Sequence, residues 1–192
     1  MKLRKIALIA GSCLILVSLL LLLGVQLRQH TGARKRQTVL QQMEVAIPET
    51  TPGIQGMEPE TQMPVLQIEG TDYVAALEIP AYGITLPVND RWSEKHLLIN
   101  PSRFCGSAYD GTLVIGGADA QGQFAFCDQI QQGAQITLTD MTGGEFTYTV
   151  SRVARAKRAT SQWLTEGEYD LTLFCRDTYS MTYIAIRCTQ IQ

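Results

Sequence analysis

The first part of the chain carries one unbroken apolar run. Residues 6–25 contain no charged side chain, and as a helix rising about 1.5 Å per residue they would extend about 30 Å, the thickness of the hydrocarbon core of a bilayer. A cleaved signal peptide usually has a shorter apolar stretch that ends in small residues, and no such site follows Val25. The run predicts an uncleaved transmembrane anchor at 6–25, preceded by a short N-terminal segment at 1–5.

The pattern changes between residues 26 and 70. Prolines interrupt this stretch repeatedly, and from residue 37 onward it carries glutamates but no lysine or arginine. Regular proline blocks helices and sheet ladders. We therefore expect a juxtamembrane segment and an extended, semi-rigid linker over 26–70, with room for a short helix around 33–44.

Residues 71–192 alternate short β-branched and aromatic runs with turn signals. Such runs are typical of strands, and a Gly-Gly turn at 143–144 joins two of them in a hairpin. Helical patterns at 93–98 and 124–129 interrupt the strands. We expect a mostly β domain, a closed or nearly closed barrel of about 7–8 strands with short helices. The predicted strands are 73–79, 84–88, 111–115, 134–139, 145–156, 170–174 and 183–189.

Charge and composition exclude several function classes for this domain. Nine lysines and arginines face thirteen aspartates and glutamates at 71–192, and no basic stripe alternates with aromatics, so nucleic acid is not an expected partner. No cysteine–histidine group has metal-ligand spacing, and no glycine-rich turn is followed by a helix with a lysine. We therefore expect neither a metal nor another cofactor.

The cysteines are odd in number. Cys13 lies in the predicted anchor, and Cys105, Cys127, Cys175 and Cys188 lie in the domain. Spacing alone assigns no disulfide among these four. One pair is argued against: if 171–175 and 183–188 are antiparallel neighbours, about five residues of offset at about 3.4 Å each separate Cys175 from Cys188. Buried free thiols are the default for the others.

Two segments of this domain carry the features of a known kind of active site. One reads Leu-Val-Ile-Gly-Gly-Ala-Asp at 113–119, and the other reads Tyr-Asp-Leu-Thr-Leu-Phe-Cys-Arg at 169–176, followed by Tyr-Ile-Ala-Ile-Arg-Cys at 183–188. They resemble the Ile-Ala-Gly-His-Asn and Leu-Thr-Leu-x-Thr-Cys segments of sortases. Residues 86–88 with 92–93, 103–107, 133–141 and 148–150 also resemble class B-type or related sortases, in the same order. The resemblance spans essentially the whole domain and implies a sortase-like barrel.

Sortases are cysteine transpeptidases of the cell surface. A cysteine thiolate attacks a Thr–Gly-type bond of a sorting signal, a histidine serves as acid or base, and an arginine on the next strand steadies the carbonyl or oxyanion. The resemblance implies a single-pass protein of the plasma membrane in a Gram-positive-type envelope, with residues 1–5 in the cytoplasm and 71–192 outside. Besides the membrane, it implies sorting-signal peptides, surface proteins or an active sortase as partners.

In this sequence the three catalytic positions of the family carry other residues. Without gaps, the histidine position falls on Ala118 and the cysteine position on Arg176. The arginine position falls on Tyr183, with Thr182 as its nearest alternative. Alanine holds no proton, and a guanidinium is not a nucleophile. We therefore interpret all three catalytic roles as vacant.

Weaker candidates lie beside these positions. Cys175 stands one residue early, where the alternation of a strand turns a side chain away from the site unless a bulge restores it. A base for it would be missing, because the histidines of the sequence are His30, beside the predicted anchor, and His96, in the helical stretch 93–98. Asp119 and Asp177 are expected to line the groove together with Thr182, although loop aspartates usually make local turn hydrogen bonds.

These observations predict a catalytically degenerate sortase homologue that binds sorting-signal-like peptides or assists the assembly of surface proteins or pili. The alternative is an active, divergent cysteine transpeptidase that anchors proteins to the cell wall through Cys175. A third hypothesis is a structural partner of a separately encoded active sortase, which needs no ligand. The sequence leaves open whether the protein is an enzyme.

Overall fold

A computed structural model describes residues 2–47 and 62–191, with side chains placed at 14–21, 32–47 and 62–191. The chain divides into two units, residues 1–37 and 38–192. Helix α1 covers Lys2–Ala46. In the portion of the chain with described residues, no helix has a stretch long and apolar enough to cross a membrane. The predicted anchor at 6–25 falls largely on residues whose side chains lie outside this description, and it stays a prediction.

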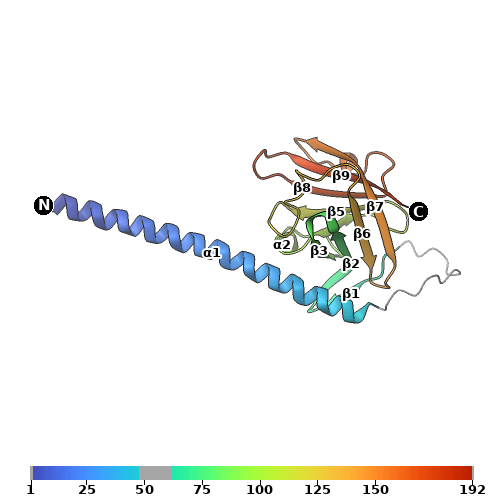
Figure 1. Cartoon of the computed structure of the whole chain (residues 1–192), viewed down its shortest axis with the longest axis horizontal. Helices are drawn as coiled ribbons and strands as arrows, with labels where there is room; N and C mark the ends of the chain where they lie inside the picture. The colour runs from blue at the N-terminus through green and yellow to red at the C-terminus, as the bar shows by residue number, and fades with distance from the viewer. Residues whose placement is uncertain (1, 48–61, 192) are drawn as a thin grey trace. The chain divides into compact units, whose positions relative to one another are not determined.

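The second unit is a closed β-barrel (Figure 1). The strands of the ring follow the order β2-β3-β4-β5-β8-β9-β7-β6, and β6 pairs with β2 to close it. The β3–β4 and β5–β8 pairs are parallel, and the other pairs are antiparallel. Strand β1 pairs with β2 outside the ring. The strands are β1 Leu66–Ile68, β2 Thr71–Ile79, β3 Ile84–Asn89, β4 Ser102–Cys105, β5 Leu113–Ala118, β6 Gln135–Asp140, β7 Glu145–Ala156, β8 Leu171–Arg176 and β9 Tyr183–Gln190.

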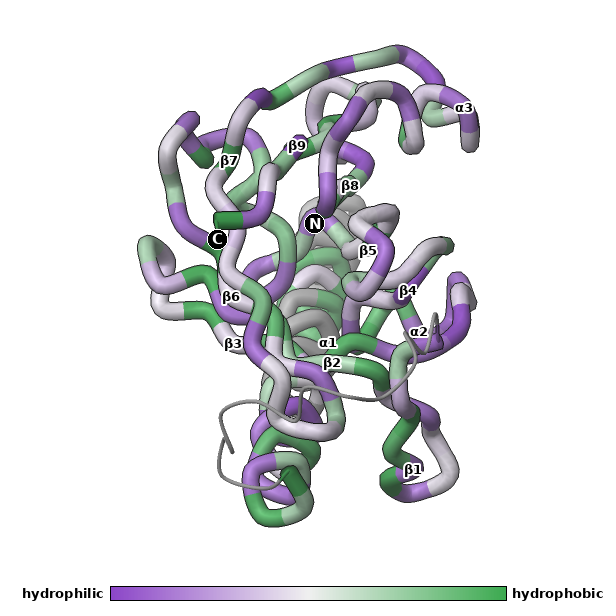
Figure 2. Tube along the Cα trace, turned by 90° about the vertical axis from the view of Figure 1, so that its right-hand side faces the viewer, coloured by the Kyte–Doolittle hydropathy of each residue, from purple (hydrophilic) through white to green (hydrophobic). Residues whose placement is uncertain are grey.

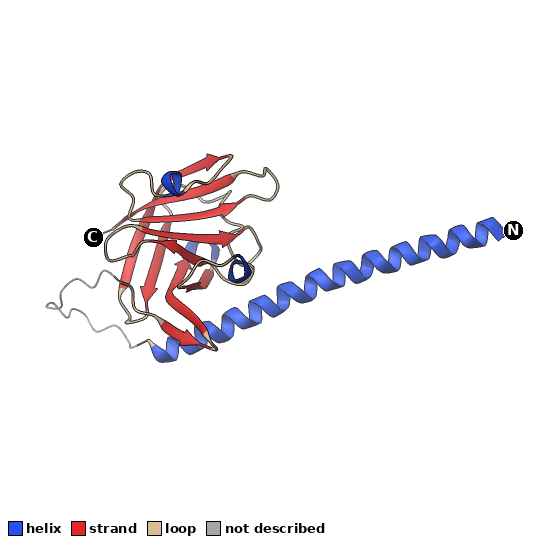
Figure 3. Ribbon diagram, turned by 180° about the vertical axis from the view of Figure 1, so that it is seen from behind, coloured by secondary structure: helices blue, strands red, loops and turns tan. Residues whose placement is uncertain are grey.

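Short helices lie on the connections between strands, as Figure 3 shows in blue. The 3-10 helix η1, Pro80–Tyr82, joins β2 to β3. Helix α2, Glu94–Leu97, precedes β4, and helix α3, Ser161–Leu164, lies between β7 and β8. The Thr160 side chain caps α3 by accepting a hydrogen bond from the Trp163 N–H at 3.1 Å.

The fold confirms the mostly β barrel and all seven predicted strands, and it differs from the prediction in several shorter elements. The helix predicted at 124–129 is wrong: this segment forms successive turns, in which the Phe124 carbonyl accepts from Cys127 N–H at 3.0 Å. Strand β4 was missed because Pro101 and Gly106 bracket it and indicate a turn. Strand β1 and helix α3 are too short to produce a periodic pattern.

The barrel interior is filled by one face of each strand. Figure 2 shows hydrophobic positions recurring along the strands of the ring. In β8, alternate residues Leu171, Leu173 and Cys175 join the interior cluster, and all are at most 2% exposed. Because strand side chains alternate, Thr172, Phe174 and Arg176 lie on the outer face. This alternation decides what chemistry β8 can present.

A second, smaller cluster connects the end of α1 to the first strands. Val39 and Met43 of α1 pack with Ile68 of β1 and Tyr73 of β2, and all four are buried. Parts of the predicted linker at 26–70 are therefore helix or strand in the structure, while residues 48–61 lie outside the described residues.

Candidate functional site

The three positions identified from the sequence lie in one row across the barrel. Strands β5 and β8 run parallel, and their register places Ala118 beside Arg176. Strand β9 runs antiparallel to β8 and places Tyr183 on the other side of Arg176. Side chains paired across a sheet point to the same face, so these three share the outer face. The structure thus brings together the three residues that the sequence resemblance predicts at the histidine, cysteine and arginine positions of sortases.

Cys175 does not join that row. Its Cα partners are Gly117 on β5 and Ile184 on β9, and its side chain belongs to the barrel interior with 2% exposure. Strand β8 pairs with β5 and β9 without a register shift, so no bulge turns the thiol outward. The thiol is therefore closed off from a substrate on the outer face.

Of the two histidines, His96 is the one whose side chain the structure describes, and no hydrogen bond among the described residues joins it to the row. His96 belongs to α2, and in the described residues its hydrogen bonds are those its backbone carbonyl accepts from Ile99 and Asn100. The side chain of His30 lies outside the described residues. A cysteine nucleophile needs a neighbouring base or cation that stabilises its thiolate. The hydrogen bonds of the described residues join no imidazole to Cys175.

Arg176 presents a positive charge in the middle of the row. Its guanidinium carbon lies 6.0 Å from the centre of the Tyr183 ring, a cation–π distance, and its Nη2 lies 4.0 Å from Met181 Sδ. The side chain is exposed, and none of the ion pairs found in the described part of the chain includes it. Its charge is therefore available to a carboxylate or a peptide carbonyl.

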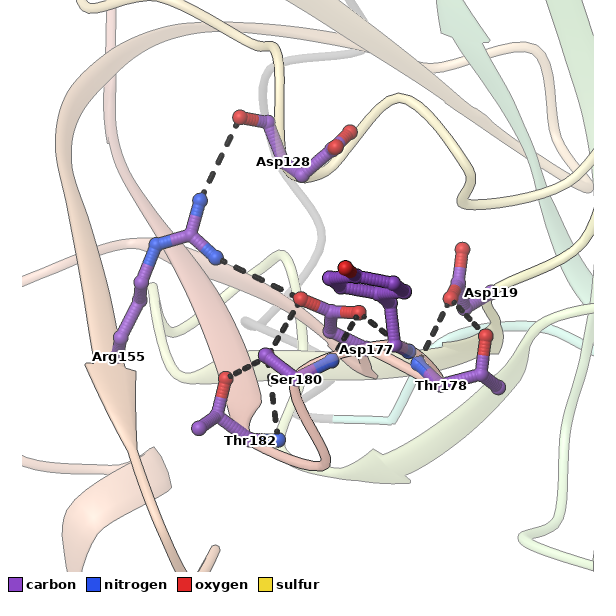
Figure 4. A network of polar contacts seen from close by, with 8 residues as sticks. Asp119, Asp128, Arg155, Asp177, Thr178, Ser180 and Thr182 are labelled. Atoms are coloured by element: carbon purple, nitrogen blue, oxygen red, sulfur yellow. Dashed lines mark hydrogen bonds and ion pairs between the residues drawn. The ribbon is translucent and has the colours of Figure 1, made fainter.

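The aspartates beside the row are occupied by local contacts (Figure 4). Asp119 accepts hydrogen bonds from the backbone and hydroxyl of Thr178 at 2.9 and 2.8 Å. The Ser180 hydroxyl donates to Asp177 at 2.6 Å and, together with backbone N–H groups, lowers the pKa of that carboxyl. Arg155 lies 4.0 Å from the same carboxylate. Asp119 and Asp177 thus shape the connection between β8 and β9.

Thr182 closes the same connection. Its carbonyl accepts from the Asp177 N–H at 2.8 Å, and its hydroxyl lies 2.6 Å from that of Ser180. The residue is part of the turn that carries the chain from Arg176 to Tyr183. The structure places the predicted groove-lining residues beside the row, but their side-chain oxygens make hydrogen bonds to residues of the β8–β9 turn.

An aromatic cluster lies next to the row on the outer face. The Trp92 ring stacks on Phe174 at 5.5 Å, and Phe104 meets both rings edge-on at 5.3 and 5.7 Å. Gly116 lies beneath them, because a Cβ there would stand 2.4 Å from Trp92 Cζ3 and 2.7 Å from Phe174 Cζ. Trp92 is 37% exposed, so the cluster has an open side.

A cavity adjoins the open side of this cluster. Its volume is about 720 Å³, and Trp92 and Phe104 form part of its wall. Arg103 and Asp90, which form an ion pair, also line it. The cavity therefore combines aromatic and charged walls, a composition suited to a peptide rather than to a purely apolar ligand.

The connection between β7 and β8 covers the rest of the outer face. Arg187 of β9 is 3% exposed and donates to the carbonyls of Trp163 and Leu164 at the end of α3. Its guanidinium carbon lies 5.5 Å from the Trp163 ring and 5.6 Å from the Tyr169 ring. Burial lowers the pKa of this guanidinium, which remains charged at neutral pH. Arg187 thus holds the α3 connection against the barrel.

Sequence reasoning missed the roles of Arg187 and Trp92. An arginine at an alternating position of a predicted strand usually indicates a solvent-exposed face. The residues around Arg187 in the sequence give no sign that its side chain donates hydrogen bonds to two carbonyls of α3. Gly116 offered a usable signal, since a glycine inside a strand often marks the close approach of another group.

Comparisons with known proteins support the fold. No family model matches the chain, and no curated protein matches it. Among solved structures, sortase A from Corynebacterium diphtheriae has a TM-score of 0.57 at 17% identity, covering 64% of this chain and 62% of that one. Sortase C1 from Streptococcus agalactiae has a TM-score of 0.57 at 20% identity, with coverage of 66% and 71%. A Clostridium perfringens sortase D5 transpeptidase has a TM-score of 0.54 at 18% identity, with coverage of 63% and 80%.

These similarities establish a sortase-like fold. The chain spans 62% of the length of the sortase A structure, and the identities are low. The class B-type assignment and the catalytic substitutions stay predictions from the sequence.

Proposed function

We propose that this protein is a catalytically degenerate member of the sortase family that binds sorting-signal-like peptides on its outer face. The observation that carries the proposal is the row Ala118–Arg176–Tyr183 across three adjacent strands. A sortase-like barrel with alanine, arginine and tyrosine in these positions has a place for a peptide but no thiolate and no proton shuttle there. The proposed protein is anchored in the plasma membrane and displays the barrel outside the cell, where it assists the assembly of surface proteins or pili.

The chemistry of the row supports peptide binding. Arg176 offers donors in a fork that matches a carboxylate or a peptide carbonyl, and the exposed side of Trp92 offers a flat apolar surface. The aromatic cluster and the row lie on the same face, because Phe174 and Arg176 are two residues apart on β8. A peptide in extended conformation would span both.

The burial of Cys175 argues against the alternative transpeptidase. An attack from this thiol would require β8 to shift by one residue against both neighbours, which would move every side chain of the strand to the opposite face. Leu171 and Leu173 would then leave the barrel interior. Such a rearrangement is too costly to accompany each turnover.

The proposal is tested by titrating the purified full chain with peptides that carry a Thr–Gly bond and a carboxylate. The chain has two tryptophans, Trp92 and Trp163, so we expect a saturable change in tryptophan fluorescence. Arg176→Gln should weaken binding about tenfold, the loss of about 1.4 kcal/mol that removing a charge-assisted contact predicts. Arg152→Gln, at an exposed arginine of the same face, is the matched control and should bind normally.

Two outcomes would contradict the proposal. If no peptide binds saturably, the peptide-binding function is wrong. If a thiol-reactive peptide mimic forms an adduct that Cys175→Ala abolishes, the active transpeptidase replaces it.

A further inference from the structure

Two buried cysteines meet inside the barrel. Cys127 and Cys175 are 1% and 2% exposed and belong to the same interior cluster. Both are free thiols, and Cys175 is near enough to Cys127 to add to the raised pKa that burial gives the Cys127 thiol. Cys127 lies on the connection between β5 and β6, whereas Cys175 lies on β8, so the contact joins segments far apart in the sequence.

The backbone independently places these two residues side by side. Gly117 is the β5 neighbour of Cys175 in the parallel ladder. The Phe124 ring lies over Gly117 so closely that a Cβ there would stand 2.4 Å from it. Cys127 follows Phe124 by one turn, since its N–H donates to the Phe124 carbonyl at 3.0 Å. The connection therefore folds onto the interior face of β5 and β8 at the level of Cys175.

The other two cysteines of the domain occupy different surroundings. Cys188 lies on β9 opposite Leu171, and its thiol lies 3.9 Å from the Ile186 carbonyl. Cys105 packs on the outer face with the cluster of Val114 and Phe174. The register of β8 and β9 places Cys175 opposite Ile184, which confirms that Cys175 and Cys188 are too far apart to bond.

We propose that Cys127 and Cys175 form a disulfide when the protein folds under oxidising conditions. The oxidant is a dithiol–disulfide exchange partner, such as oxidised glutathione or a thiol oxidase of the same class. One cysteine thiolate attacks the oxidant's disulfide, which forms a mixed disulfide and releases the first thiolate of the oxidant. The second cysteine thiolate then attacks the cysteine sulfur of the mixed disulfide and releases the second thiolate of the oxidant, and the two protons of the cysteines end on the two released thiols. The inference does not depend on the proposed function.

The timing of this reaction follows from burial. Burial raises the pKa of the Cys127 thiol well above its ordinary value, and the hydrogen bond with Cys175 adds to the effect. The thiol, not the thiolate, therefore persists in the folded barrel, and exchange needs the thiolate. The bond is expected to form before the barrel closes and to be resistant to reduction afterwards.

The disulfide would have two consequences for the site. It would fix the β5–β6 connection, which carries Asp119 and Asp128, to the strand that carries Arg176. It would also tie up the thiol of Cys175, the one cysteine of β8, so that Cys175 could not act as a nucleophile.

The test compares the full chain refolded from denaturant in oxidised and in reduced glutathione. Free thiols are then alkylated, and the digested chain is mapped by mass spectrometry. We expect the oxidised sample to lose two hydrogen atoms in mass and to yield one cross-linked peptide pair that joins Cys127 to Cys175. The thermal midpoint of the oxidised sample should be higher by about 5 °C or more, as a cross-link over a long loop predicts.

Single variants identify the two cysteines of the bond. For each variant, the thermal midpoint after oxidised refolding is compared with the midpoint of the same variant after reduced refolding, so a change in its overall stability does not affect the comparison. Cys127→Ala and Cys175→Ala should show no redox-dependent midpoint, whereas Cys105→Ala and Cys188→Ala should keep the full difference. Four alkylated thiols at 105, 127, 175 and 188 after oxidative refolding would overturn the inference, and so would a cross-link through Cys105 or Cys188.

Discussion

The two faces of strand β8 differ in the kind of side chain they carry and in what those side chains contact. The inner face carries Leu171, Leu173 and Cys175, which are buried among the apolar side chains of the other strands. The outer face carries Thr172, Phe174 and Arg176, which meet aromatic rings, the α3 connection and finally solvent. The inner face supplies buried apolar side chains and so contributes to stability. The outer face carries the charged and aromatic groups on which the proposed peptide binding depends.

The largest expected effect comes from the inner face. Leu173→Ala should lower the free energy of unfolding by about 3 kcal/mol, because it removes buried methyl groups and leaves a cavity. Leu173 is fully buried, whereas Leu98 is 77% exposed, so Leu98→Ala is the matched control and should change stability by less than about 0.5 kcal/mol. Chemical denaturation measures both. Equal effects would mean that β8 does not face the interior as described.

The next effect concerns Arg187, a buried charge of the outer face. Arg187→Lys should destabilise the protein by about 2 kcal/mol, because an ammonium group cannot replace the planar fork that reaches the carbonyls of Trp163 and Leu164. Amide hydrogen exchange should accelerate most in residues 157–170. Arg152→Lys is the control, since Arg152 pairs with Arg187 across β7 and β9 but is exposed. Uniformly faster exchange in both variants would contradict a local role.

A smaller effect should appear at alkaline pH and belongs to the inner face. Burial raises the pKa of the Cys188 thiol to about 12, whereas an unfolded thiol ionises near its ordinary pKa of about 8.5 to 9. The folded state therefore holds a proton that the unfolded state releases, and stability should fall as the pH rises above about 9 toward 12.

Between pH 8 and 10 this thiol should account for a loss of about 1.5 kcal/mol in the reduced protein. Urea unfolding at the two pH values measures it. Cys188→Ala should lose less stability over the same interval than the parent chain, and an identical loss in the two proteins would refute the assignment.

The smallest effect on stability is expected at the row itself. Arg176→Ala should change the free energy of unfolding by less than about 0.5 kcal/mol, because the side chain is exposed and its contacts are a ring and a thioether. A thermal melt suffices to measure it. A loss above about 2 kcal/mol would mean that Arg176 supports the fold and would remove the contrast between the two faces of β8.

The barrel could be predicted from the sequence because apolar and polar residues alternate along its longer strands. β7 and the β6–β7 hairpin have clear patterns. The resemblance to sortases singled out Ala118, Arg176 and Tyr183, but the register that places them side by side is seen only in the strand pairings. The contacts between distant segments could not be predicted in this way. The Cys127–Cys175 contact and the Arg187–α3 contact depend on connections whose paths leave no periodic signal, and the turns at 124–129 have a helix-like composition but too few residues to propagate a helix.

The small cluster of Val39 and Met43 with Ile68 and Tyr73 also bears on where the second unit begins. The last turns of α1 pack on β1 and β2, so a shortened chain that starts at residue 62 would leave Ile68 and Tyr73 without this apolar cover. A stable barrel fragment should therefore begin before Val39.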